Sequence, residues 1–99
     1  MRMLMMVTVP VEKGSQAISD GTLPRVIQET LERLKPEATY FTAIGGKRTA
    51  LFFFDQHDSS QTPSIAEPLF MNLNAEIEFF PVMTPEDLMK GLSEAGLAG

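Results

Sequence analysis

The sequence contains no cysteine and only one histidine, His57. Without cysteine, neither a disulfide framework nor a thiolate-bound metal can form. The histidine is flanked by Asp55 and Asp58, but one imidazole with adjacent carboxylates lacks the convergent ligand spacing of a metal site. We therefore expect no metal ion and no other cofactor.

Basic residues are scarce as well. The chain has 8 Lys and Arg residues against 13 Asp and Glu residues, which gives a formal net charge of -5. An acidic surface repels phosphate backbones, and no stripe of basic residues offsets that repulsion. We expect no binding of nucleic acid.

Long hydrophobic runs are also missing. The apolar run from Met3 to Val9 ends at Pro10, far short of the roughly 20 residues that cross a bilayer as a helix. The N-terminal segment also lacks the small-residue cleavage site that follows the basic start of a signal peptide. We expect a cytoplasmic protein that does not enter a membrane.

What the chain does contain is enough apolar residues for one core, because 43% of its 99 residues are hydrophobic. This predicts a single domain over residues 1–99. The patterned segments follow one another as strand, helix, hairpin, helix and strand, with a short C-terminal helix. We expect them at residues 3–9, 22–35, 40–54, 62–71, 75–82 and from 84 onward, with a weaker helical segment over 12–19.

The first main helix has the clearest pattern. Its apolar residues recur at helical spacing on one side, and Thr22 is a suitable N-cap residue. The side consists of Leu23, Val26, Ile27, Leu31 and Leu34.

The hairpin is predicted from Gly45-Gly46, because glycine accepts the positive φ of a two-residue turn. Pairing of Ile44 with Lys47 then sorts the side chains by face. One face carries Tyr40, Thr42, Thr49, Leu51 and Phe53, and the other carries Phe41, Ala43, Arg48, Ala50, Phe52 and Phe54.

This order of elements predicts a ferredoxin-like α+β sandwich, βαββαβ, with an antiparallel four-stranded sheet in the order 4-1-3-2. The continuous apolar run of residues 3–9 suits a central strand, and the alternation of residues 75–82 suits an edge strand. The two main helices each have one apolar side, which is enough to cover one face of the sheet.

The other sheet face is expected to lack a helical cover although it carries large apolar groups. Such a patch on a small protein usually marks an interface or a ligand groove. A two-fold homodimer that packs sheet against sheet would bury it. The expected interface residues are Met6, Leu51, Phe53 and Phe80, with Leu4 beside them.

Hydroxyls and one carboxylate share this face. Small-molecule pockets are mostly apolar with a few such polar groups, so the predicted ligand-binding residues are Tyr40, Thr42, Thr8, Thr49 and Glu78. The other interpretation is that these side chains only make cross-strand and dimer contacts.

Four segments carry a resemblance to a known superfamily: Asp20-Gly21-Thr22-Leu23-Pro24, Lys35-Pro36-Glu37-Ala38, Gly46-Lys47-Arg48-Thr49-Ala50 and Pro81-Val82-Met83. Through them, and through the order of its elements, the chain resembles the dimeric α+β barrel superfamily and a group of small uncharacterised bacterial proteins within it. The resemblance implies ferredoxin-like protomers packed face to face. The superfamily includes cofactor-free monooxygenases, isomerases, haem-dependent members and ligand-sensing domains.

Two classes of function follow as hypotheses. The first is a homodimer that binds a small apolar or aromatic metabolite in the sheet-face cavity. As an enzyme it would be a cofactor-free monooxygenase or isomerase, with Tyr40 as the polar group and His57 as a distant candidate base. The second is a non-catalytic sensor or protein-interaction module, in which His57 is a solvated loop residue.

Overall fold

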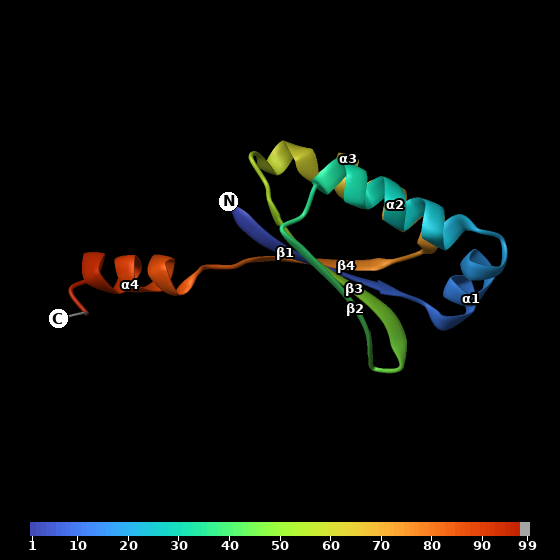
Figure 1. Ribbon diagram of the computed structural model, residues 1–99, viewed down its shortest axis with the longest axis horizontal. Coiled ribbons are helices and arrows are strands. Elements are labelled where there is room, and N and C mark those ends of the chain that lie inside the picture. The colour runs from blue at the N-terminus through green and yellow to red at the C-terminus, as the bar shows by residue number, and fades with distance from the viewer. Residues whose placement is uncertain (98–99) are drawn as a thin grey trace.

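The computed structural model describes residues 1–97 and has an α+β fold, in which an open antiparallel sheet is covered by helices on one face (Figure 1). Its class is compatible with the ferredoxin-like fold expected from the sequence. The elements are β1 (Arg2–Val9), α1 (Val11–Ser19), α2 (Thr22–Leu34), β2 (Ala38–Ile44), β3 (Lys47–Asp55), the 3-10 turn η1 (Ser59–Gln61), α3 (Thr62–Leu73), β4 (Glu76–Pro81) and α4 (Pro85–Glu94).

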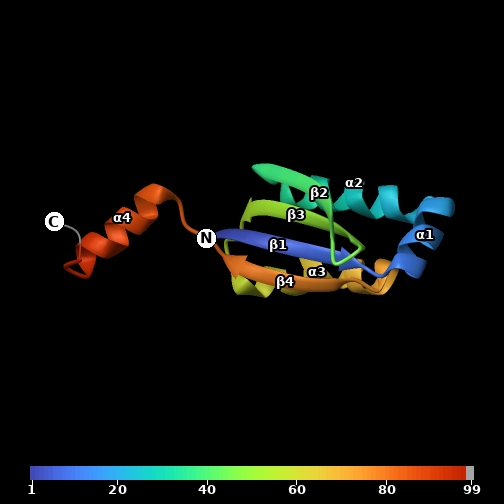
Figure 2. The ribbon, with the colours of Figure 1, turned by 90° about the horizontal axis from the view of Figure 1, so that it is seen from below.

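The four strands lie in the order β2-β3-β1-β4, which reads 4-1-3-2 from the opposite edge (Figure 2). β1 is therefore an inner strand, paired with β3 on one side and β4 on the other. Its apolar residues face both sides of the sheet. Met3, Met5, Val7 and Val9 are buried beneath the helices, and the alternate residues are half-buried on the other face.

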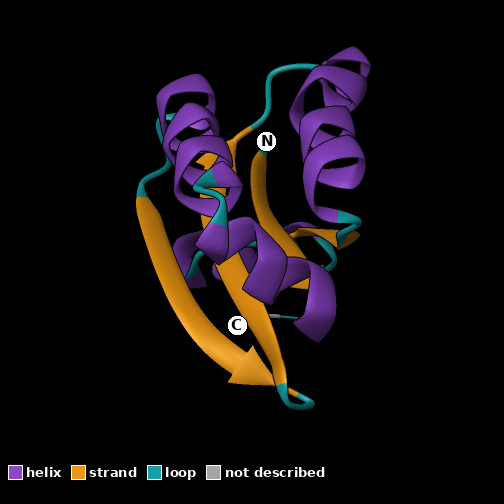
Figure 3. Cartoon of the chain, turned by 90° about the vertical axis from the view of Figure 1, so that its right-hand side faces the viewer, coloured by secondary structure: helices purple, strands orange, loops and turns teal. Residues whose placement is uncertain are grey.

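The core lies between the sheet and the pair α2 and α3, which run along the same face (Figure 3). Met5 and Phe52 are direct partners across β1 and β3, and both side chains are fully buried. Val26, Ile65, Leu69 and Leu73 close the core from the helices.

The hairpin between β2 and β3 has the predicted register, with Ile44 opposite Lys47. Gly45 and Gly46 have φ of 60° and 76°, values that side chains with a Cβ rarely adopt. The turn therefore confirms the predicted division of hairpin side chains between the two faces.

The start of α2 differs from the prediction that Thr22 is its N-cap. Gly21 occupies that position with φ 81°, and Thr22 is already the first helical residue. The carboxylate of Asp20 accepts the backbone N–H of Thr22 at 2.9 Å, and hydrogen bonding from Thr22 lowers the pKa of Asp20. A carboxylate satisfies an orphan helix donor as well as a hydroxyl does.

The last helix, α4, extends away from the sheet (Figures 1 and 2). Its start is a capping box, in which Thr84 Oγ1 accepts the Asp87 N–H at 3.0 Å and Asp87 Oδ2 accepts the Thr84 N–H at 3.1 Å. The bond from Thr84 is the main reason that the pKa of Asp87 lies below its ordinary value of 3.8, with Arg2 and Lys90 adding to the shift.

This lowered pKa predicts that α4 loses helical structure in acid. Because the folded-state pKa of Asp87 is lowered, its stabilising contribution is complete above the ordinary value of 3.8 and is lost as the pH falls through the folded-state pKa. The ¹³Cα shifts of residues 86–94 should therefore move toward coil values only below that pH. Asp87→Asn, whose side chain does not titrate, should remove this acid transition, and an unchanged transition in that variant would contradict the assignment.

Candidate functional site

The face of the sheet opposite α2 and α3, here called the open face, is organised in three rows that cross all four strands. The apolar row is Phe80, Leu4, Phe53 and Ala38. The middle row is Glu78, Met6, Leu51 and Tyr40, and the hydroxyl row is Glu76, Thr8, Thr49 and Thr42. Polarity thus increases along the strands, from the start of β1 toward its end.

Every residue that the sequence assigned to a dimer interface or a ligand site lies on this face. Tyr40 and Phe80 are 61% and 39% exposed, while Met6, Leu51 and Phe53 are half-buried. The Tyr40 and Phe53 rings make a T-shaped contact, with their centres 6.5 Å apart. The structure brings these residues together on one surface, and their roles remain predictions.

Thr49 differs from the other predicted ligand-binding residues. It is 3% exposed, and its hydroxyl donates to the carbonyl of Lys47 at 3.0 Å. That hydroxyl therefore already has a partner in its own strand. Thr8 is half-buried and Thr42 is exposed, so their side chains are accessible from the open face.

The three rows contain few groups that can move a proton. Besides the Tyr40 phenol, their ionisable groups are Glu76 and Glu78, both on the edge strand β4. Glu78 and Tyr40 share a row but are separated by three strand spacings, or about 14 Å at ~4.8 Å per spacing. Within one protomer they are too far apart to share a proton.

His57 lies elsewhere, in the loop between β3 and η1. Its Nδ1 is 3.5 Å from the Asp55 carboxylate, and its backbone N–H donates to Gln61 Oε1 at 3.0 Å. The amino group of Met1 donates to Asp55 at 2.8 Å and is the main cause of the lowered pKa of Asp55. The two weak catalytic candidates, Tyr40 and His57, are thus on different surfaces.

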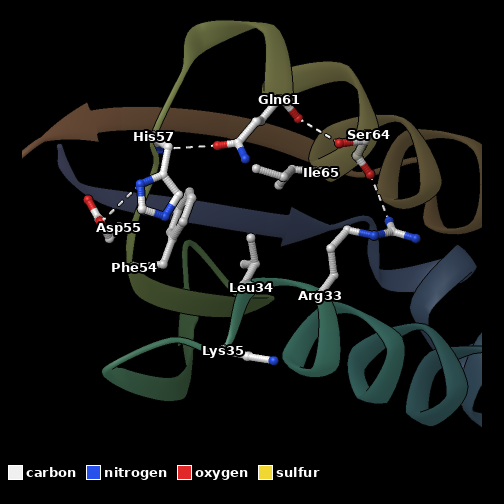
Figure 4. Close-up of a pocket in the computed structure, with 9 residues that line it drawn as sticks. All are labelled: Arg33, Leu34, Lys35, Phe54, Asp55, His57, Gln61, Ser64 and Ile65. Carbon is white, nitrogen blue, oxygen red and sulfur yellow. Dashed lines mark hydrogen bonds and ion pairs between the residues drawn. The ribbon is translucent and has the colours of Figure 1, made fainter.

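The His57 side chain lines an open cavity of about 410 Å³ between the end of α2 and the start of α3 (Figure 4). Arg33 donates to the Ser64 carbonyl at 2.7 Å, and the Ser64 hydroxyl donates to the Gln61 carbonyl at 2.8 Å. The first bond ties α2 to α3, and the second lies within the start of α3. The lining residues are Arg33, Leu34, Lys35, Phe54, Asp55, His57, Gln61, Ser64 and Ile65.

No local pattern predicted this second cluster. Arg33 and Ser64 are 31 positions apart, and they meet only because the two main helices pack side by side. Arg33 was recognisable as a basic residue in the last turn of its helix, where it favours the helix dipole. No local spacing indicated its contact with α3.

Within residues 1–97, no group of three or more His, Cys, Asp or Glu side chains is arranged to hold a metal ion. Over the same part of the chain, no helix combines the length and the apolar composition that crossing a membrane requires. Comparison with protein-family models, with curated proteins and with solved structures gave no match.

Proposed function

We propose that the chain forms a two-fold homodimer, a dimeric α+β barrel, whose facing sheets enclose a cavity for a small apolar or aromatic molecule. The observation that carries this proposal is the open face, on which apolar side chains from all four strands lie without a covering helix. Its apolar and middle rows contain Leu4, Met6, Leu51, Phe53 and Phe80.

Association with a second copy is the commonest way to bury such a face. A sheet with one exposed apolar face packs well on another sheet at a separation of about 10 Å. A two-fold axis makes the same patch serve both partners. The resemblance to dimeric α+β barrels agrees with this arrangement.

The chemistry of the rows indicates the ligand class. The apolar row offers contact area, and Tyr40, Thr8 and Thr42 offer hydroxyls that can bond one polar group of a ligand. Glu76 and Glu78 make the rest of the face acidic, which disfavours anions. The ligand that fits best is therefore neutral, apolar or aromatic, and carries one or two polar atoms.

A binding or sensing role fits the open face better than catalysis. A cofactor-free monooxygenase or isomerase needs a base within hydrogen-bond reach of the reacting atom. His57 is on another surface, and within one protomer Glu78 is three strand spacings from Tyr40. A non-catalytic sensor or interaction module needs only the cavity and a change of shape when it fills.

Native mass spectrometry of freshly purified protein tests the proposal directly. We expect a dimer that carries an additional small mass, which fragmentation would identify. A dimer without added mass would support the assembly. The ligand would then be sought by screening neutral aromatic compounds. A monomer at micromolar concentration would refute the barrel.

Tyr40→Phe should weaken ligand binding while leaving the dimer intact. The change removes one hydroxyl and keeps the ring against Phe53, so the loss should match one hydrogen bond, about 0.5–1.5 kcal/mol or roughly 2- to 12-fold in Kd. Calorimetry with 2-naphthol as the probe measures it. Phe41→Leu, one position away but on the helix-covered face, is the control and should leave the Kd unchanged. Equal affinities for Tyr40→Phe and the parent chain would show that the Tyr40 hydroxyl does not bind the ligand.

A further inference from the structure

Both ends of α4 are closed by hydrogen-bonded capping motifs. The capping box of Thr84 and Asp87 closes its start. At its end, Gly96 has φ 73°, its N–H donates to the Ser93 carbonyl, and the Leu97 N–H donates to the Leu92 carbonyl at 2.8 Å. This pair of bonds is a Schellman motif. The ten-residue helix is therefore encoded as a helix and not as a frayed tail.

Caps alone do not stabilise a helix of this length. Isolated helices shorter than about 12–15 residues are marginal in water, and most helical stability in proteins comes from packing of an apolar side. α4 has such a side, here called the α4 stripe, made of Leu88, Met89 and Leu92 at helical spacing. Leu88 and Met89 are 47% and 55% exposed and Leu92 is half-buried, so the stripe is largely uncovered by the rest of residues 1–97.

The attachment of α4 keeps it off its own sheet. The Val82 N–H donates to the Arg2 carbonyl at 3.1 Å and extends the pairing of β4 with β1 by one residue. Arg2 Nη1 also lies 3.9 Å from the Asp87 carboxylate. From this point the helix continues outward, beyond the end of the sheet (Figure 1).

The shape of the protomer reflects this extension. Its longest dimension is 56 Å and its radius of gyration is 16.0 Å, whereas a compact domain of this size has a radius of gyration of about 13 Å. The protomer is thus a compact body with one projecting helix, a form that suits exchange between two copies.

We propose that α4 docks through its stripe on the apolar row of a second copy of this chain, and that it thereby closes one end of the cavity between the sheets. The proposal rests on the dimer of the proposed function. It adds that each ligand site is incomplete until the second copy supplies α4.

Two observations favour a second copy as the occupant. First, α4 leaves the sheet at the end where the apolar row of Phe80, Leu4 and Phe53 lies, because Pro81 directly precedes the linker. In a face-to-face dimer, the helix of one copy then begins next to the edge of the shared interface. Second, the polar side of α4 carries Glu86, Asp87 and Glu94 against Lys90 alone, while helices that lie on membranes are rich in Lys and Arg on that side.

The absence of cysteine makes a direct test simple. Ser93→Cys, at an exposed position bordering the stripe, gives the full chain one site for a nitroxide label. The labelled chain is mixed with an equal amount of unlabelled, ¹⁵N-enriched chain, so that broadening of the ¹⁵N signals reports only on contacts between copies. We expect selective loss of intensity at the amides of Leu4, Phe53 and Phe80, and little change at Thr42.

A matched pair of variants separates docking from dimerisation. Leu88→Ser combined with Leu92→Ser should abolish the broadening between copies while native mass spectrometry still shows a dimer. Lys90→Ser, on the polar side of the same helix, should leave the broadening unchanged.

Three outcomes would overturn the proposal. A dimer without broadening between copies would refute α4 docking and leave the proposed barrel standing. If broadening is absent from the mixed sample and appears only in a second sample, in which the nitroxide-labelled chain is itself ¹⁵N-enriched and diluted with unenriched chain, α4 folds back on its own sheet. A monomer, or a chain that sediments with vesicles of phosphatidylcholine and phosphatidylserine, would refute the second copy as the occupant.

Discussion

Phe53→Glu should convert the proposed dimer into folded monomers. Phe53 lies in the apolar row of the open face, next to Leu4 on one side and Ala38 on the other. In the dimer its replacement would place one unpaired carboxylate per copy against apolar side chains, at a cost of several kcal/mol each. In the free protomer the same position is only half-buried, so the carboxylate can reach water and the fold survives.

Native mass spectrometry combined with circular dichroism measures both parts of this result. Phe53→Leu keeps the position apolar and serves as the control, which should remain dimeric. If Phe53→Glu keeps the dimer mass and a native spectrum, the open face is not the interface. If it unfolds, Leu51→Glu in the middle row gives a second measurement of the same interface at a different position.

Phe52→Ala should destabilise the fold of the protomer itself, with a large loss of stability that is independent of assembly. The Phe52 side chain is 0% exposed, pairs with Met5 across the sheet, and meets the Phe41 ring edge-on at 6.4 Å between ring centres. Replacing a buried phenylalanine by alanine costs about 3–5 kcal/mol. Domains of this size have total stabilities of about 5–15 kcal/mol, so the variant should lose a large share of its free energy of unfolding.

Urea unfolding at a fixed protein concentration measures this loss, because association would otherwise contribute to the apparent stability. The control is Phe53→Ala, the same chemical change at the adjacent position on the open face. In dilute, monomeric protein it should lower the free energy of unfolding by much less than Phe52→Ala. Equal losses from the two variants would mean that the faces of β3 are not distinguished as described.

Much of the fold follows from local patterns in the sequence. The side of α2 that contacts the core was readable from helical spacing, and the inner limits of the hairpin strands, Ile44 and Lys47, followed from Gly45-Gly46. The division of β3 between the two faces was readable because the side-chain period of a strand is two. Each of these signals lies within a few residues of the feature that it predicts.

The candidate site was harder to predict because it depends on contacts between distant segments. Alternation placed Tyr40 and Thr42 on the open face, but nothing local showed that the Thr49 hydroxyl bonds the Lys47 carbonyl. The cluster of Arg33, Ser64 and His57 depends on how two helices pack. No pattern within α4 indicated that Leu88 and Met89 would stay exposed.

The predicted N-cap of α2 was also wrong. The hydroxyl of Thr22 was a reasonable cap by residue type, but Asp20 competes for the same backbone donor. The Asp20-Gly21 dipeptide was the available signal, because glycine supplies the positive φ that lets the preceding carboxylate reach forward.

The two-residue turn at Gly45-Gly46 also limits how the length of this chain can change. Inserting or deleting one residue within β3 would move every following side chain of that strand to the opposite face. Phe52 would then meet water or the second copy, and Phe53 would enter the core. Relatives of this protein should therefore differ in length at the loop between β3 and α3, or beyond Val82, and only by even numbers inside the paired segments of the hairpin.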